Sequence, residues 1–200
     1  MRWHNHLLIA GAVFVVAAAT TAVALAATGT THRAAAAAHH TRKADDVRLE
    51  LTPSSAQLAA CMPDAQLTFE VSLTGDRHGS DRVEVSGHGL PANTDFTIFL
   101  LQQPGAPFGA AEYIGDLSTD ADGDAHTNLQ LIVGEAFAST LVGGIRTRVD
   151  LNSVGVWFAD PTGDDFCLGQ GNGAVTPFDG DNQAGVQAFN SANADPLPAP

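Results

Sequence analysis

The stretch AQLTFEVSL, residues 65–73, decides the fold class because its side chains alternate between apolar and polar. Its apolar members are Leu67, Phe69, Val71 and Leu73. A period of two places alternate side chains on opposite faces of a strand. The stretch is therefore predicted to be a β-strand with one face buried and the other in solvent.

Seven further segments carry a strand-like pattern, and turn-forming clusters such as GHGLPANT (87–94) separate some of them. The best helical candidate, GEAFASTLV (134–142), is too short to change the class. The pattern predicts an all-β fold, an antiparallel immunoglobulin-like β-sandwich, with a β-barrel as the alternative. The seven further segments are residues 47–51, 81–87, 95–102, 111–118, 125–133, 151–159 and 184–190.

The N-terminal segment has the layout of a secretory signal peptide. Residues 7–27 carry no charge, and Ala24-Leu25-Ala26 is a small-x-small cleavage pattern. We expect a signal peptide over residues 1–26. The alternative is an uncleaved anchor, because about 20 apolar residues can span a bilayer. In both cases the rest of the chain is exported, and the protein is expected to be secreted or on the extracellular face of the cell membrane.

Two other segments flank the predicted domain. Residues 27–46 form an Ala- and His-rich linker without bulky apolar side chains. Such a segment cannot bury enough surface to offset its ordering entropy, so it is predicted to be disordered. Residues 191–200 are rich in Pro and Ala and are predicted to be a disordered tail. The β-sandwich domain is therefore expected over residues 47–190.

From Val47 onward the chain is acidic, with five basic and twenty acidic side chains and a net charge of −15. Proteins need a positive surface to displace counterions from nucleic acid, and basic clusters to dock on anionic lipid. Nucleic acid is therefore not an expected partner. Contact with the membrane is expected only through the N-terminal segment, if that segment is uncleaved. The expected partner is an extracellular protein or a small-molecule ligand.

The sequence contains two cysteines, Cys61 and Cys167. An even number of cysteines in an exported chain indicates a disulfide bond. Two free thiols, or a zinc site without a second pair of ligands near either cysteine, are weaker hypotheses. We therefore predict a Cys61–Cys167 disulfide that closes a long loop.

The stretch STDADGDAH (118–126) contains three alternating aspartates, Asp120, Asp122 and Asp124. Counted as an EF-hand loop from Asp120, it has its glycine at the fourth position instead of the sixth, and Leu131 in place of the final Glu. An Asp-Gly pair between strand-like segments instead predicts a tight hairpin turn. A calcium site of another kind, held by the three aspartates, is the alternative.

No motif in the sequence indicates an enzymatic reaction. The nucleophile-elbow pattern G-x-S-x-G and the zinc-protease pattern HExxH are both missing. GQGNG (169–173) shares only its glycines with a phosphate-binding loop, and it lacks the strand–helix context that dinucleotide binding needs. No catalytic residue and no cofactor are therefore expected.

Aromatic side chains offer the best candidates for a binding cleft. Trp157 and Phe158 are adjacent on a predicted strand, so their rings point to opposite faces. One face is expected to be core, and the other could line a cleft or a partner surface. The predicted wall residues of a cleft are Trp157, Phe99, Tyr113 and Phe137.

Two long stretches, residues 86–126 and 154–191, resemble a group of secreted β-sandwich proteins of high-GC Gram-positive bacteria. The shared patterns are LPxNTDF, PFG, YxGD, TDxxG, WF and TPFxGxxxAGxQ, and a composition with a single lysine also fits such a genome. This resemblance covers most of the domain. It implies export and a β-sandwich, and it adds no catalytic residue.

A second resemblance is to the neocarzinostatin-like apoproteins, which are acidic, secreted immunoglobulin-like sandwiches that hold a small aromatic molecule in a cleft. It is carried by VEVSGHGLPANTDFTIFLLQ, TDADGDAHTNLQLIV and EAF. That family has two short-range disulfides, whereas this chain offers one long-range pair. We expect an exported, non-catalytic binding or interaction module, with a small-molecule carrier as the alternative and a secreted enzyme as a third hypothesis.

Overall fold

The computed structural model describes residues 46–73, 79–133, 136–176 and 183–197. These residues belong to one compact unit that spans Thr41–Pro200. The predicted signal peptide and nearly all of the predicted linker lie outside the described residues. Within the described residues, no helix is long and apolar enough to cross a bilayer.

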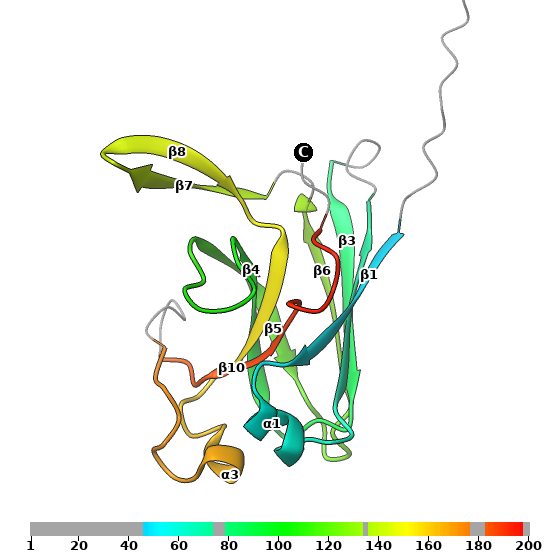
Figure 1. Cartoon of the computed structure of the whole chain (residues 1–200). Helices are drawn as coiled ribbons and strands as arrows, with labels where there is room; N and C mark the ends of the chain where they lie inside the picture. The colour runs from blue at the N-terminus through cyan, green and yellow to red at the C-terminus, as the bar shows by residue number, and fades with distance from the viewer. Residues whose placement is uncertain (1–45, 74–78, 134–135, 177–182, 198–200) are drawn as a thin grey trace, which may run out of the picture. The chain divides into compact units, whose positions relative to one another are not determined.

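Ten strands and two short helices make up the described structure (Figure 1). Each of the eight predicted strands is present, with ends that differ from the prediction by a few residues. Their bounds are β1 Asp46–Pro53, β2 Gln66–Ser72, β3 Asp81–His88, β4 Asp95–Leu101, β5 Ala111–Ser118, β6 Ala125–Leu131, β9 Ser153–Phe158 and β10 Gln187–Asn190.

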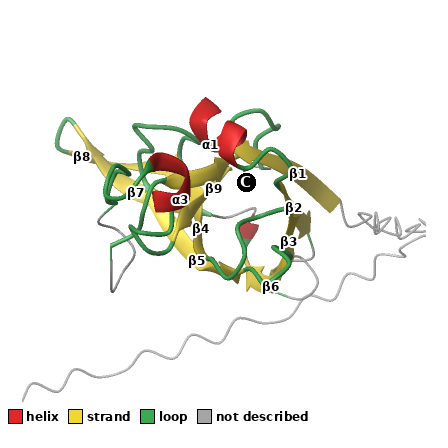
Figure 2. Cartoon of the chain, turned by 90° about the horizontal axis from the view of Figure 1, so that it is seen from below, coloured by secondary structure: helices red, strands yellow, loops and turns green. Residues whose placement is uncertain are grey.

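These eight strands form one antiparallel sheet in the order β5-β4-β9-β10-β1-β2-β3-β6. Strand β1 turns the sheet from one layer to the other. Its first part, Asp46 to Leu51, pairs with β2, and its last two residues pair with β10. Figure 2 shows the strands following one another around a ring. The predicted all-β antiparallel sandwich is therefore confirmed, and the shared strand gives it a barrel-like outline.

The main core lies inside this ring and is built from alternate residues of the strands. Phe69 of β2, Phe96 of β4, Phe158 of β9 and Phe189 of β10 are at most 1% exposed. The ring centroids of Phe96 and Phe158 lie 5.1 Å apart. Alternation along each strand therefore places its apolar set inside, as the period of two predicts.

A second, smaller core lies on the outer face of the β4–β9 layer. Phe99, Leu101 and Trp157 are buried there together with Ala184, and Phe108 packs against them. Phe108 belongs to the loop after β4, and its ring centroid lies 5.0 Å from that of Trp157. Both faces of β4 and β9 are therefore covered, which explains why these two strands are apolar almost throughout.

The two helices, α1 Ala56–Cys61 and α3 Asp165–Leu168, are joined by the predicted disulfide. Cys61 and Cys167 form a bond with a Cα–Cα distance of 5.6 Å. Ser55 caps the N-terminus of α1 by accepting a hydrogen bond from the Leu58 N–H, 3.2 Å away. The prediction of the disulfide pair is confirmed, and the helices themselves were not predicted.

The helical interpretation of residues 134–142 is wrong over its described part. Residues 137–142 form strand β7 (Phe137–Val142), which pairs in antiparallel register with β8 (Ile145–Asp150). The turn between them is Gly143-Gly144, with φ of +58° and +83°. Two residues with positive φ are what a tight hairpin turn needs, and this turn favours strands on either side over a helix.

The C-terminal segment also differs from its prediction. Residues 191–197 of the expected disordered tail contact the sandwich. Ser191 Oγ accepts a hydrogen bond from the Val154 N–H, and Leu197 donates its N–H to the Asn152 carbonyl at 2.8 Å. Leu197 is also buried in the main core. A further hydrogen bond runs from the Ser191 N–H to the Val154 carbonyl at 3.0 Å, so backbone pairing and a buried leucine together hold this stretch beside β9.

Candidate functional site

The two edge strands of the sheet, β5 and β6, face each other across a seam. They meet at one end through a single bridge between Thr119 and Ala125. Further along, a Cβ added at Gly115 would lie 2.6 Å from a methyl carbon of Leu129, so the side chain of Leu129 occupies the space that Gly115 leaves. Beyond these contacts β5 pairs only with β4, and β6 only with β3, among the described strands. The other end of the seam is therefore open.

A pocket of about 570 Å³ lies at this open end, and we name it the seam pocket. Residues 112–114 of β5 and residues 130–132 at the end of β6 form two of its sides. Leu100 reaches it from β4, and Ala136 and Phe137 line it from the start of β7. Its volume falls within the usual range for small-ligand sites, about 300–1,000 Å³.

Glu112 is the one acidic side chain among the described residues that line the seam pocket. Glu112 is the register partner of Leu100, which faces the core, so both side chains are on the same face of the layer. Within the described part of the chain, the Glu112 carboxylate forms no ion pair or side-chain hydrogen bond. The pocket thus combines mainly apolar walls with one unpaired negative charge.

The four predicted wall residues fall into two environments. Trp157 and Phe99 are 1% and 2% exposed and belong to the outer core, where their ring centroids are 5.4 Å apart. Tyr113 is 50% exposed, touches Phe99 edge-on at 5.8 Å, and lines the seam pocket. Phe137 is also 50% exposed and lines the same pocket. The structure therefore brings Tyr113 and Phe137 to one site and places Trp157 and Phe99 in the outer core, away from the lining of that site.

Strands β7 and β8 form a separate two-stranded sheet that projects from one end of the sandwich (Figure 1). Ala136 and Phe137, where this hairpin begins, line the seam pocket. We name this hairpin, residues 137–150, the arm. Its end carries three apolar side chains in solvent, which we name the tip. These are Leu141, Val142 and Ile145, which are 65%, 60% and 72% exposed. Burying these side chains against a partner would lower the free energy by about 25 cal/mol per Å² of apolar surface removed from water.

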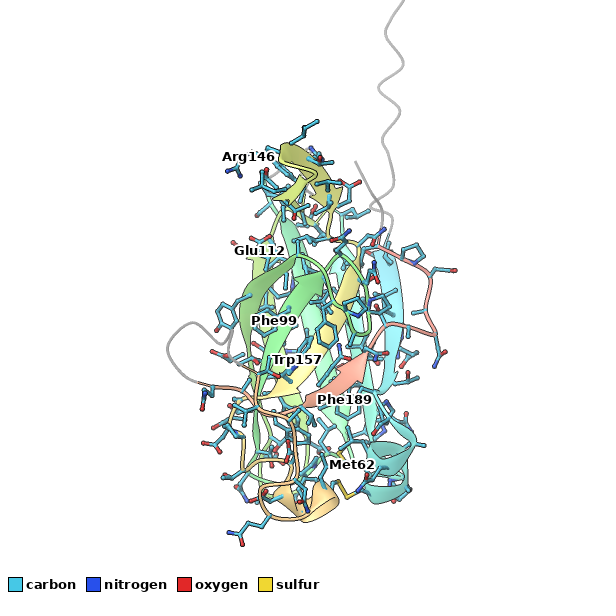
Figure 3. All side chains as sticks on the ribbon, turned by 60° about the vertical axis from the view of Figure 1, so that its left-hand side comes forward. Met62, Phe99, Glu112, Arg146, Trp157 and Phe189 are labelled. Atoms are coloured by element: carbon cyan, nitrogen blue, oxygen red, sulfur yellow. A yellow bond between two sulfur atoms is a disulfide. The ribbon has the colours of Figure 1, made fainter. Side chains whose placement is uncertain are left out.

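The arm carries two of the five basic side chains of the acidic domain. Arg148 lies over the ring of Phe137, 4.1 Å from its centroid, and its Nε lies 3.0 Å from an oxygen of Asp150. Arg146 donates a hydrogen bond to Ser139 Oγ at 3.3 Å. In the described residues, Arg146 has no ion pair with a carboxylate. Figure 3 shows Arg146 on the arm and Glu112 at the end of the sandwich from which the arm leaves.

The outer face of β1, β2, β3 and β6 differs from the arm, because its charges are matched on the sheet. Arg48 pairs with Glu50 at 2.8 Å and lies 3.9 Å from Glu70. The hydrogen bond from Arg48 is the main cause that holds the pKa of Glu50 below its ordinary value. Arg82 lies 3.8 Å from Glu84 in the same way. The charges of this face are paired with one another, so fewer unpaired groups are open to a partner here than on the arm.

The turn predicted at residues 118–126 is present, and Asp120 organises it, but the predicted hairpin is limited to the single bridge between Thr119 and Ala125, because β5 pairs with β4 and β6 with β3. Asp120 Oδ1 accepts hydrogen bonds from the N–H groups of Asp122 and Asp124, at 2.9 and 3.0 Å. Gly123 has a φ of +80° and lies against the backbone of Leu90. Among the described residues, no group of three or more His, Cys, Asp or Glu side chains comes together as a metal site. Calcium binding by the three aspartates stays a prediction.

One buried carboxyl group lies at the helical end of the domain. Asp164 precedes α3, is fully buried, and accepts a hydrogen bond from the Val186 N–H at 3.1 Å. Its Oδ1 has no hydrogen-bond partner among the described residues. Burial raises the pKa of Asp164, and the nearby Asp165 adds to the rise, against the lowering effect of the Val186 hydrogen bond. The group is enclosed by Gly173 and Gly185, which leave no room for a ligand.

The sequence matches no protein-family model and no curated protein sequence. The site therefore stands on its geometry. Sequence reasoning missed the tip and both arginines of the arm, although Gly143-Gly144 between two runs of β-forming residues is a hairpin signal that could have found them. It also missed Glu112, for which the sequence carries no distinguishing signal.

Proposed function

We propose that this protein is an exported, non-catalytic β-sandwich that acts outside the cell or at its surface as a binding module, and that the arm and the seam pocket form its binding surface. The observation that carries the proposal is the exposed tip of the arm. Three apolar side chains are exposed at the end of a projecting hairpin on an acidic domain. Val142 and Ile145 are cross-strand partners, and Leu141 is on the opposite face of the hairpin beside Arg146. Exposed apolar surface of this kind marks interaction sites.

The seam pocket supports the same proposal. It adjoins the root of the arm, so a partner that covers the arm also reaches Tyr113 and Phe137. Exposed aromatic side chains and an unpaired arginine are the groups that contribute most to binding at protein interfaces. The two features together give an apolar centre and a charged rim, which is the usual layout of such an interface.

A small-molecule carrier is the second candidate, and the seam pocket is the observation that favours it. Its size suits a small ligand, and two aromatic side chains line it. The outer core counts against a deep cleft, because Trp157 and Phe99 pack against each other and against Phe108. A cargo of this kind would bind against Tyr113, Phe137 and Glu112.

A site-specific cross-link tests the proposal. A photoreactive phenylalanine derivative is placed at Val142 on the tip, with a matched derivative at the exposed Ser86 on the outer face of β3 as control. After export by the native host and irradiation, we expect covalent protein adducts from position 142 and none from position 86. Equal labelling at the two positions, or none at position 142, would contradict the proposal.

A further inference from the structure

The arm and the seam pocket are chemically complementary to each other. The tip presents apolar side chains next to Arg146, whose positive charge has no carboxylate partner among the described residues. The pocket presents apolar walls next to Glu112, whose negative charge is likewise unpaired there. An occupant of the pocket should therefore carry an apolar end beside a cation, and the arm meets that description.

The charge on the arm, and not the net charge of the molecule, favours the same occupant. The domain from Val47 onward has a net charge of −15, whereas the arm, with two arginines and Asp150, has a net charge of +1. Its attraction to the acidic pocket of a second copy therefore acts against the repulsion between two bodies of like charge. That repulsion also acts between the body and an anionic membrane, and a membrane lacks the single carboxylate beside apolar walls that the arm complements.

The position of the arm sets the symmetry of such a contact. Each strand of the arm has six residues, so the arm extends about 20 Å at roughly 3.3 Å per residue. A compact domain of this length has a radius of gyration of about 15 Å, so the arm is longer than the radius of the domain that carries it. The tip therefore lies too far from its own root to cover the pocket there. The pocket adjoins that root. If the tip of one copy lies in the pocket of a second, a two-fold axis places the second tip in the first pocket.

We propose that two copies of this chain bind each other by reciprocal exchange of their arms. The tip of each copy covers the seam pocket of the other, and Arg146 pairs with the second copy's Glu112 on both sides of the axis. This inference rests on the proposed function, since it names the partner of the same surface. The contact is isologous and closed, so it yields a dimer and no higher assembly.

The test is the oligomeric state of the full exported chain, with its disulfide intact, measured by light scattering after size-exclusion chromatography at low and high protein concentration. We expect a dimer for the wild type. Glu112→Arg and Arg146→Glu should each raise the dimer dissociation constant about tenfold or more, because each places like charges together at two symmetric points. The combined variant E112R/R146E should restore the dimer, because it exchanges the two charges.

Arg82→Glu is the matched control. It makes the same change in net charge as Arg146→Glu, but on the outer face of β3, where Arg82 pairs with Glu84, and it should leave the dimer unchanged. A monomeric wild type, or a combined variant that stays monomeric while its circular dichroism spectrum is native, would overturn the inference.

The outcomes also separate this inference from the proposed function. A monomeric protein that still cross-links through position 142 to a different protein keeps the function and overturns arm exchange. A monomer that instead sediments with vesicles of phosphatidylglycerol, through its tip, overturns arm exchange and assigns the arm to the membrane. A monomer without adducts or sedimentation overturns both.

Discussion

The guanidinium of Arg148 lies 4.1 Å above the ring of Phe137, across the two strands of the arm. Arg148 also pairs with Asp150 at 3.0 Å, so its charge is used within the arm. These contacts hold the root of the arm, where Phe137 lines the seam pocket. Arg146 lies nearer the tip, donates a hydrogen bond to Ser139 Oγ, and has no carboxylate partner among the described residues. Of these two arginines on one strand, only Arg148 is therefore ion-paired within the described part of the chain.

Replacing the tip should affect binding without affecting the fold. Leu141→Ser and Ile145→Ser replace exposed apolar side chains by polar ones. Substitutions at exposed positions usually change the free energy of unfolding by less than about 0.5 kcal/mol. We expect an unchanged urea midpoint and a loss of the adducts formed at position 142. A large fall in the midpoint would show that the tip packs within its own chain.

Trp157 should contribute to stability and not to binding. It is 1% exposed, between the rings of Phe99 and Phe108. Trp157→Ala should lower the free energy of unfolding by about 3–5 kcal/mol, the usual loss for a buried aromatic side chain. Tyr113→Ala, half-exposed on the same layer, is the control and should lower it by about 1 kcal/mol or less. Similar losses for the two variants in urea denaturation would contradict this assignment.

The disulfide should contribute strongly to stability, because Cys61 and Cys167 are 106 residues apart. In the chain-entropy account, a loop of this length restricts the unfolded state by about 4–5 kcal/mol. We expect the urea midpoint to fall accordingly when the protein is reduced, or when both cysteines are replaced by serine. A reduced protein with an unchanged midpoint would mean that α1 and α3 are held by their packing alone.

Stability should depend on pH through Asp164. Burial holds its pKa above the ordinary value, so the folded state binds this proton more tightly than the unfolded state. The resulting stabilisation is complete below the ordinary carboxyl pKa, and it is lost as the pH rises through the raised pKa. Asp164→Asn should therefore raise Tm at neutral pH by about 2–4 °C, the effect of about 1 kcal/mol in a domain of this size.

The gain from Asp164→Asn should disappear in acid, where the wild-type carboxyl is itself neutral. Asp195→Asn is the control, since it removes an exposed carboxyl group of the C-terminal segment. Thermal scans across the acid range check both variants. A gain that persists at the lowest pH would show that charge at position 164 is not its cause.

Two glycines with positive φ should differ sharply in their tolerance of alanine. A Cβ at Gly123 would lie 2.3 Å from the carbonyl oxygen of Leu90, whereas one at Gly143 meets nothing within 4 Å. Gly143→Ala should lower the free energy of unfolding by about 1 kcal/mol, the strain of a left-handed residue. Gly123→Ala adds a backbone clash and should lose at least twice as much. Equal losses in denaturant titrations would contradict the close approach to Leu90.

The eight strands of the sandwich could be predicted because each has at least one buried face. A stretch such as residues 65–73 must alternate when one face packs on a core and the other meets water. No residue of the arm is fully buried, and FASTLV lacks such an alternation, so it was interpreted as a short helix. Its Gly143-Gly144 turn was the remaining signal. Local pattern therefore identifies strands through burial, and it fails where a hairpin has no fully buried face.

The candidate site was only partly predictable for a different reason. Trp157 and Phe99 point to the outer face of their layer, as the alternation predicted, but the loop that carries Phe108 covers that face. No periodic pattern reports where an irregular loop will pack. The seam pocket depends on where β5 and β6 diverge, which is a property of the whole sheet. Tyr113 and Phe137 were identified as aromatic residues, and only the structure brings them to one pocket.

The most direct measurement is native mass spectrometry of the protein purified from its own host without chelator, compared with Leu141→Ser/Ile145→Ser. The account predicts a complex whose extra mass is protein and which is lost in the arm variant. A small-molecule mass that survives in the variant would contradict a protein-binding module and favour the carrier. A monomer without extra mass would contradict both the binding module and the carrier. An added mass equal to calcium would show that the protein binds this metal, for which the loop of Asp120 is the predicted site.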